Sequence, residues 1–151
     1  MSIRLSEDEA WEVLRTAHTG IFTTLRRDGF PVSLPVWFVV EDRTILVAGP
    51  AVTKKFARVR HDDRVSFLVE SGERWRELCA VHVVGRAQIV EDPDWAHVDE
   101  LLDAKYLGYR TPRAEMPESA RERYDSQRAL VRITPEGRLL TWDNARFETR
   151  S

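Results

Sequence analysis

Alternating apolar and polar positions along much of the chain predict a protein built mainly of β-strands. Between residues 31 and 40 every second position is apolar, which favours a strand with one face in the core. Residues 78–91 alternate in the same way, and Cys79 falls on their apolar face, where an inert thiol is expected. Strands are therefore predicted at residues 21–26, 31–40, 44–49, 64–70, 78–91, 129–134 and 138–142.

In two of these predicted strands, the face that points away from the core carries residues that call for a contact of their own. In residues 31–40 the core face carries Val32, Leu34, Val36, Phe38 and Val40, and the other face carries Ser33, Pro35, Trp37 and Val39. In residues 78–91 the polar face carries His82, Arg86 and Gln88. Neither polar face has an evident partner within one chain, so both are candidates for contacts in a dimer.

Turn and capping signals complete the expected order of elements. Arg27-Asp28-Gly29 and Pro135-Glu136-Gly137 each predict a hairpin between the flanking strands. Ser6 and Glu9 form a capping box for a helix that runs to about Ala17. Further helices are expected from Thr53, from Asp92-Pro93 to about Tyr106 with proline in the first turn, and from Pro117, with a loop over residues 106–115.

The resulting fold class is α+β with strands dominating. Six or seven strands with few helices favour a small closed antiparallel barrel. With 151 residues, of which 42% are hydrophobic, the chain can bury one good core, so residues 1–151 are expected to form a single domain.

Charge and cysteine content exclude several classes of function. The net charge is −2, from 23 basic and 25 acidic residues, which gives no general basic field for binding nucleic acid. The lone cysteine excludes an internal disulfide and indicates a reducing, cytoplasmic location. No long apolar run predicts a membrane segment. The histidines lack the spacing of a metal site, and we find no catalytic triad and no glycine-rich phosphate loop.

The most informative chemical feature is a pair of lysines in the first turn of a predicted helix. Thr53 is a good N-cap, so Lys54 and Lys55 fall where the helix dipole disfavours a cation by ~0.3–1 kcal/mol. A bound anion would remove this conflict, because it would rest on the free N–H groups of that turn and on the lysines. The pattern predicts a phosphate site; the alternative is a pair of solvated lysines.

Several segments in order resemble a known family. Residues 24–38, residues 55–67, Gly85-Arg86-Ala87 and Trp142-Asp143 are similar to the split-barrel flavin-binding superfamily. This is the pyridoxamine 5′-phosphate oxidase-like group, which includes enzymes that use the deazaflavin coenzyme F-420. The resemblance covers most of residues 18–146.

The resemblance implies a homodimer of six-stranded split barrels, with a flavin-like cofactor in each groove between the subunits. By position, Lys55 would be the main phosphate ligand, helped by Thr53, Lys54 and Arg58. The ring system would lie beside the predicted strand at 31–40 and its neighbour at 44–49. Its contacts there would be Ser33, Pro35, Val36, Trp37, Val47, Ala48 and Gly49, and Trp75 is a further candidate in a segment that departs from the family pattern.

The function implied is that of an oxidoreductase in which the cofactor performs hydride transfer to a small electron-poor organic acceptor. F-420 is favoured over FMN because Arg58, Arg60, Arg110 and Arg113 offer cations to its anionic tail. No catalytic residue is assigned, although a proton could come from solvent, Tyr106 or Tyr109. The alternatives are an FMN-dependent oxidase and a non-catalytic carrier or small-ligand binding protein on the same fold.

Overall fold

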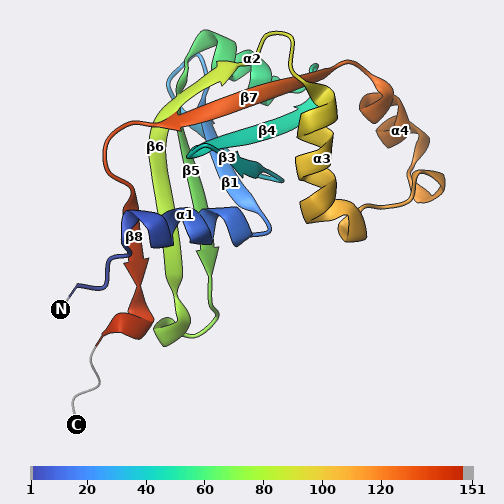
Figure 1. Ribbon diagram of the computed structural model, residues 1–151. Coiled ribbons are helices and arrows are strands. Elements are labelled where there is room, and N and C mark those ends of the chain that lie inside the picture. Colours follow the sequence, from blue (N-terminus) through green and yellow to red (C-terminus); the bar gives the residue numbers. More distant parts are fainter. Residues whose placement is uncertain (1, 148–151) are drawn as a thin grey trace.

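The computed structural model describes residues 2–147, which fold around one strongly curled antiparallel sheet (Figure 1). The sheet has the order β2-β1-β5-β6-β7-β4-β3, with β8 also paired to β6. The strands are β1 (Gly20–Leu25), β2 (Pro31–Val36), β3 (Val39–Glu41), β4 (Thr44–Pro50), β5 (Arg64–Ser71), β6 (Cys79–Ile89), β7 (Arg128–Pro135) and β8 (Leu140–Asp143).

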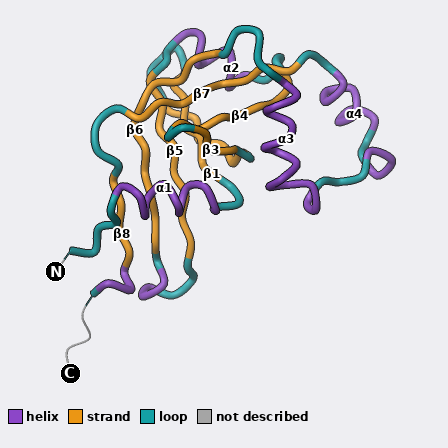
Figure 2. Tube along the Cα trace, in the orientation of Figure 1, coloured by secondary structure: helices purple, strands orange, loops and turns teal. Residues whose placement is uncertain are grey.

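Residues 2–147 include four α-helices. Figure 2 shows the helical segments around the sheet. The first, α1 (Glu7–Thr16), begins with the predicted capping box, in which Ser6 accepts from the Glu9 N–H. The others are α2 (Lys54–His61), α3 (Trp95–Tyr106) and α4 (Glu118–Asp125). Short 3-10 turns occupy Trp75–Glu77 (η1), Leu107–Tyr109 (η2), Arg113–Glu115 (η3) and Asn144–Arg146 (η4).

The main core fills the inside of the curled sheet. Phe22, Phe38, Phe56 and Phe67 are fully or almost fully buried there, and Leu14 of α1 closes one side. A smaller apolar cluster lies between α3 and the outside of β3, β4 and β7, where it includes Tyr106. Among residues 2–147, no helix combines the length and the apolar character needed to cross a membrane.

The predicted strand at residues 31–40 is broken into two. β2 ends at Val36 and β3 begins at Val39, so Trp37 and Phe38 belong to neither strand. Because β2 is the edge strand and its ladder partner is β1, its inner face is only partly covered, and Leu34 is 39% exposed. The prediction that Leu34 lies in the core was therefore wrong, whereas Phe38 is fully buried as expected.

The predicted hairpin across Pro135-Glu136-Gly137 was also wrong. β7 pairs with the second half of β6 and β8 pairs with its first half, so the two strands run in the same direction along one edge. An eleven-residue β6 is long enough for both. Residues 136–139 form an excursion between them instead of reversing the chain.

Two smaller corrections concern the helices. α3 begins at Trp95 and not at Pro93, because the Asp94 side chain accepts from the His97 N–H and caps the helix there. Residues 107–116 contain two 3-10 turns within the predicted loop, and α4 follows Pro117 as expected.

Candidate functional site

The first turn of α2 carries a half-buried cation that lacks an anionic partner. Lys55 Nζ lies 3.2 Å from Thr53 Oγ1 and makes no ion pair with any residue in the range 2–147. Burial lowers the pKa of Lys55, and the nearby positive charges of Arg123 and Arg58 add to this effect. The site therefore holds a costly charge that an anion would compensate.

Thr53 occupies the N-cap position, but its hydroxyl does not cap the helix. It donates to the Pro50 carbonyl oxygen at 2.9 Å and accepts from Lys55. The N–H groups of the first turn therefore receive no hydrogen-bond acceptor from the Thr53 side chain. Uncapped N–H groups at a helix N-terminus favour the binding of an anion.

Arg58 extends the cationic surface along α2. Its Nε donates to Thr24 Oγ1 at 2.6 Å, and Thr24 is a buried polar residue of β1. This contact fixes the guanidinium beside a cavity of about 290 Å³. Lys54 also lines this cavity. The charged and titratable residues that line the cavity are Arg26, Arg27, Lys54, Arg58 and His61, and only Arg26 pairs with a described carboxylate, that of Asp28.

Gly49 of β4 lies directly beneath the lysine. A Cβ at this position would be 3.3 Å from Lys55 Nζ and 3.5 Å from the Phe56 ring, so glycine leaves the ammonium room that alanine would reduce. Gly49 also borders a second cavity, of about 660 Å³, together with Ala48 and Trp37. Three of the predicted cofactor contacts thus meet at the wall of one cavity, next to the predicted phosphate ligand.

The outer walls of the 660 Å³ cavity come from residues of α3, α4 and the segment between them. Figure 1 shows these two helices on one side of the sheet. Tyr109, Met116 and Tyr124 lie along this wall. Tyr109 was predicted only as a possible proton donor, and Met116 and Tyr124 were not predicted at all. The loop composition at residues 106–115 gave no signal for Met116 or Tyr124, because both follow that loop in the sequence. Arg123 and Thr24 were missed for a different reason, since their contacts join elements that are distant in the sequence.

Other predicted contacts are not brought to the two cavities. Ser33 and Pro35 are exposed on β2, and Val36 is half-buried there. Val47 is completely buried in the main core, so its side chain faces away from both cavities. Trp75 belongs to η1, between β5 and β6, and its ring stacks on that of Phe147. The turn between β5 and β6 lies at the opposite end of the sheet from α2 (Figure 1).

The two proposed proton donors differ in their surroundings. Tyr106 is fully buried, its hydroxyl donates to the His18 carbonyl oxygen at 2.7 Å, and burial raises its pKa to about 12. It is therefore structural and a poor acid. Tyr109 is exposed and lines the 660 Å³ cavity.

Cys79 and His82 are both half-buried near the start of β6. Cys79 is less buried than the core position expected for it, and its thiol pKa is raised by burial and by Asp143. Within residues 2–147 no group of three or more histidine, cysteine or acidic side chains is arranged to hold a metal ion.

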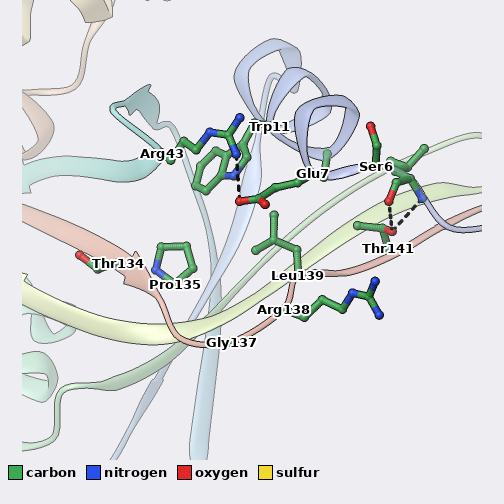
Figure 3. A pocket seen from close by; sticks show the side chains of 12 residues that line it. Ser6, Glu7, Trp11, Arg43, Thr134, Pro135, Gly137, Arg138, Leu139 and Thr141 are labelled. Atoms are coloured by element: carbon green, nitrogen blue, oxygen red, sulfur yellow. Dashed lines mark hydrogen bonds and ion pairs between the residues drawn. The ribbon is translucent and has the colours of Figure 1, made fainter.

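A further cavity, of about 430 Å³, lies between α1 and the excursion at residues 136–139 (Figure 3). Trp11 and Leu139 form its apolar part, and Arg43 at its rim pairs with Glu7 at 2.9 Å. It is lined by none of the predicted cofactor contacts.

Comparison with solved structures places this architecture among split-barrel proteins. A conserved hypothetical protein from Mycobacterium tuberculosis is 29% identical with a TM-score of 0.80, over 99% of this chain and 93% of that chain. An FAD-binding protein from Mesorhizobium loti is 23% identical with a TM-score of 0.66, over 88% and 91%. A heme storage protein from Vibrio cholerae is 18% identical with a TM-score of 0.68, over 96% and 99%.

The strand order and this likeness define a split-barrel fold. The family model for pyridoxamine 5′-phosphate oxidase matches residues 6–141, and the chain belongs to that family. A search of curated proteins finds no match to the chain.

Proposed function

We propose that this protein binds a phosphate-bearing flavin-type cofactor at the first turn of α2 and acts as an oxidoreductase. The observation that carries the proposal is Lys55, a half-buried ammonium with a lowered pKa and no described carboxylate partner. Arg58 and Arg123 add positive charge close to it. A phosphate would offset the desolvation of Lys55 and the repulsion among these three cations.

The arrangement around Lys55 fits such a group. The absence of a side chain at Gly49 leaves the ammonium free to move toward a ligand, and Thr53 supplies a hydroxyl beside it. The first N–H groups of α2 add directed donors that require no charge. In this proposal Lys55, Thr53 and the backbone of the first turn hold the phosphate, and Lys54 contributes from the helix surface.

The proposed cofactor is F-420, with FMN as the alternative. F-420 carries an anionic oligoglutamate tail beyond its phosphate, whereas FMN ends at the phosphate. Arg110 and Arg113, two of the arginines expected to bind that tail, pair instead with Asp103 and Asp125. The support for a longer anion comes instead from the 290 Å³ cavity, whose cations other than Arg26 have no described acidic partner.

When bound and reduced, such a cofactor would supply a hydride, two electrons with one proton, to an electron-poor organic acceptor, and the acceptor would take its second proton from solvent or from Tyr109. The chain's own residues bind and orient. Trp37, fixed on Tyr106, forms one wall of the 660 Å³ cavity and keeps water from that side. Tyr109 has the exposed hydroxyl from which a proton could be delivered.

The proposal includes a homodimer and a cytoplasmic location. Support for a dimer comes from the outer face of the sheet. The strand register places the polar face of β2 and the polar face of β6, which were predicted as two separate contact faces, in the same rows across the sheet. Ser33, Thr23, Ser66 and Val84 form one row across four strands. Pro35, Ile21, Leu68, His82 and Leu140 form the next row. Support for a reducing compartment is limited to the free, half-buried Cys79.

The decisive experiment is titration of the purified protein with F-420 and with FMN, monitored by cofactor fluorescence. Lys55→Ala should weaken binding roughly 30-fold or more, since removing one partner of a partly desolvated charge pair typically costs ~2–5 kcal/mol. Lys54→Ala is the matched control and should weaken binding less, because Lys54 is exposed. Wild-type affinity in both variants would refute the phosphate site.

Turnover separates the enzyme from a carrier. The reduced cofactor bound to the protein should be reoxidised by an organic acceptor faster than the same cofactor in solution. A protein that binds cofactor tightly through Lys55 and produces no such acceleration with any acceptor would be a carrier or a ligand-binding protein. A yellow protein that consumes oxygen would instead identify an FMN-dependent oxidase.

A further inference from the structure

The 430 Å³ cavity between α1 and residues 136–139 takes no part in the proposed function, and its volume lies within the range of small-molecule sites (Figure 3). Its apolar surface comes from Leu5, Ala10, Trp11, Pro135 and Leu139. These residues belong to the segment before α1, to α1 itself, to the end of β7 and to the excursion that follows β7. The apolar body of a ligand would therefore meet apolar surface from several elements.

The walls of this cavity are attached to the sheet by hydrogen bonds. Leu5 N donates to Thr141 Oγ1 at 2.9 Å, which joins the segment before α1 to β8 (Figure 3). On the other wall, Glu136 N donates to the Val84 carbonyl oxygen at 2.8 Å, and the Glu136 carboxylate pairs with Arg86 at 2.9 Å. Because the walls are held in this way, a ligand would have little of the chain to order on binding.

The side chain of Trp11 brings a polar group without a partner to this cavity. Trp11 is only 8% exposed, and its indole N–H, which can only donate, makes no hydrogen bond within residues 2–147. Among these residues no side-chain nitrogen or oxygen is both sealed from solvent and without a partner, so the indole nitrogen reaches accessible space. The cavity is the space that Trp11 lines. A hydrogen-bond acceptor on a ligand there would satisfy a donor that the protein leaves unpaired.

The charges next to Trp11 indicate that this acceptor is uncharged. Glu7 precedes Trp11 by four residues and therefore lies on the same face of α1. Its carboxylate is 2.9 Å from Arg43 Nη1, and Arg43 also pairs with Asp8. Two carboxylates around one guanidinium leave an excess of negative charge, which disfavours an anion. The other arginine of the lining, Arg138, is exposed, and its side chain points away from Trp11 (Figure 3).

From these observations we propose that the 430 Å³ cavity is a second ligand site, which binds a small, mainly apolar molecule that carries one uncharged carbonyl group. The carbonyl oxygen accepts from the Trp11 indole N–H, and the apolar body packs against Pro135 and Leu139. The lining of this site shares no residue with the proposed cofactor site. The inference therefore does not depend on the proposed function.

Three probes that share one skeleton test the site. They are acetophenone, α-methylstyrene, in which a methylene group replaces the carbonyl oxygen, and benzoate, in which a charged oxygen replaces the methyl group. Each is titrated into isotope-labelled protein while NMR follows the indole N–H resonances of the five tryptophans. Acetophenone should move the Trp11 resonance downfield in a saturable way, because its proton enters a hydrogen bond. The other two probes should each bind at least about threefold more weakly.

Each other result of the titration would overturn the inference. No saturable shift of the Trp11 resonance, or a shift confined to another indole, would mean that Trp11 does not hold the probe and that solvent alone satisfies its N–H. Binding of α-methylstyrene as tight as that of acetophenone would contradict the hydrogen bond. Binding of benzoate as tight as that of acetophenone, or tighter, would contradict the preference for an uncharged group.

Variants locate the bound probe. Trp11→Phe identifies the Trp11 resonance by its loss, and it should abolish the preference for acetophenone over α-methylstyrene, because both probes then lack a donor to meet. An undiminished preference would refute the role of the indole.

A second variant keeps the test decisive if Trp11→Phe does not fold. Leu139→Ala should weaken acetophenone binding several-fold. Leu101→Ala is the matched control and should not, because Leu101 is also half-buried but packs in the cluster beside α3, outside the cavity. An unchanged affinity in Leu139→Ala, or displacement of acetophenone by saturating F-420 or FMN, would place the probe elsewhere and overturn the inference.

Discussion

The indole ring of Trp37 lies flat on the phenol ring of Tyr106, with centroids 4.4 Å apart and an angle of 2° between the planes. Tyr106 also explains the break between β2 and β3, which leaves Trp37 and Phe38 outside both strands. Phe38 N donates to Tyr106 Oη at 3.0 Å, and Lys105 Nζ donates to the Phe38 carbonyl oxygen at 2.9 Å. Two consecutive residues of α3 thus replace the ladder partners that Phe38 lacks.

Tyr106→Phe should destabilise the fold while leaving the stacking surface for Trp37 in place. It removes the hydroxyl that accepts from Phe38 N and donates to the His18 carbonyl oxygen, and these buried groups would lose a partner. The expected loss in the free energy of unfolding is ~1–3 kcal/mol, measurable by urea denaturation.

Tyr109→Phe is the matched control for that experiment. Tyr109 contacts the ring of His18, the residue whose carbonyl oxygen accepts from Tyr106, at a centroid distance of 4.5 Å. It is largely exposed, however, and its hydroxyl has no hydrogen bond within residues 2–147. Its removal should change stability by less than about 0.5 kcal/mol. Equal effects of the two substitutions would show that the Tyr106 hydroxyl does not hold the Trp37–Phe38 break.

The break also shows where sequence reasoning reached its limit. Alternation correctly indicated that Phe38 is buried, but it could not indicate that the strand stops at Val36. The cause is a pair of hydrogen-bonding groups 67 and 68 residues further along the chain. The predicted hairpin after β7 was wrong for a similar reason. The turn signal at Gly137 depends on neighbouring residues, whereas β8 pairs with β6, a strand that lies far away in the sequence.

Lys105 should make stability depend on alkaline pH. Burial lowers its pKa from 10.5 to about 8. Between these values the unfolded chain binds a proton that the folded chain does not, so the free energy of unfolding should rise with pH from about 8 toward about 10. One group contributes at most about 1.4 kcal/mol per pH unit, and less if solvent screens the site.

Lys105→Met should remove this contribution, which appears as the difference between wild-type and variant urea midpoints at about pH 8 and about pH 10. The comparison is needed because the lowered pKa of Lys55 acts with the same sign. Above pH 10 the raised pKa of Tyr106 acts with the opposite sign, since the folded state then retains a proton that the unfolded state loses. Parallel pH profiles for the two proteins would contradict the burial of the Lys105 ammonium.

The phosphate site stays a prediction, and sequence reasoning reaches only some of the residues around it. Lys55 was predicted because a cation in a first helical turn breaks a local rule, and Gly49 was predicted from the family resemblance. The additional members Thr24 and Arg123 come from β1 and α4, and nothing local marks them. Val47 was assigned to the site with its neighbours Ala48 and Gly49, but the alternation of β4 directs its side chain into the core.

The proposed dimer predicts that light scattering at micromolar concentration gives twice the chain mass. An obligate interface of roughly 2,000 Å² or more would cover the outer face of the sheet. Val84 is 55% exposed in the row with Ser33, Thr23 and Ser66, so Val84→Asp should weaken the dimer by placing a charge in it. Leu107→Asp is the control, because Leu107 is exposed on η2 and not on the sheet. A monomer mass for the wild type would contradict the dimer.

Gly49→Ala should separate cofactor affinity from stability. The added Cβ would be 3.3 Å from Lys55 Nζ, so the flexible end of the lysine must shift by a few tenths of an ångström while the backbone stays in place. Stability should change by no more than ~1 kcal/mol, since the loss of chain entropy in the unfolded state favours alanine. Affinity for the phosphate-bearing cofactor should fall roughly threefold to tenfold, which corresponds to ~0.7–1.4 kcal/mol.

Gly108→Ala is the matched control, because a Cβ there meets nothing within 4 Å, and it should leave the affinity unchanged. An affinity for F-420 or FMN that is the same in Gly49→Ala as in the wild type would show that the position of the Lys55 ammonium above β4 is not the one that holds the phosphate.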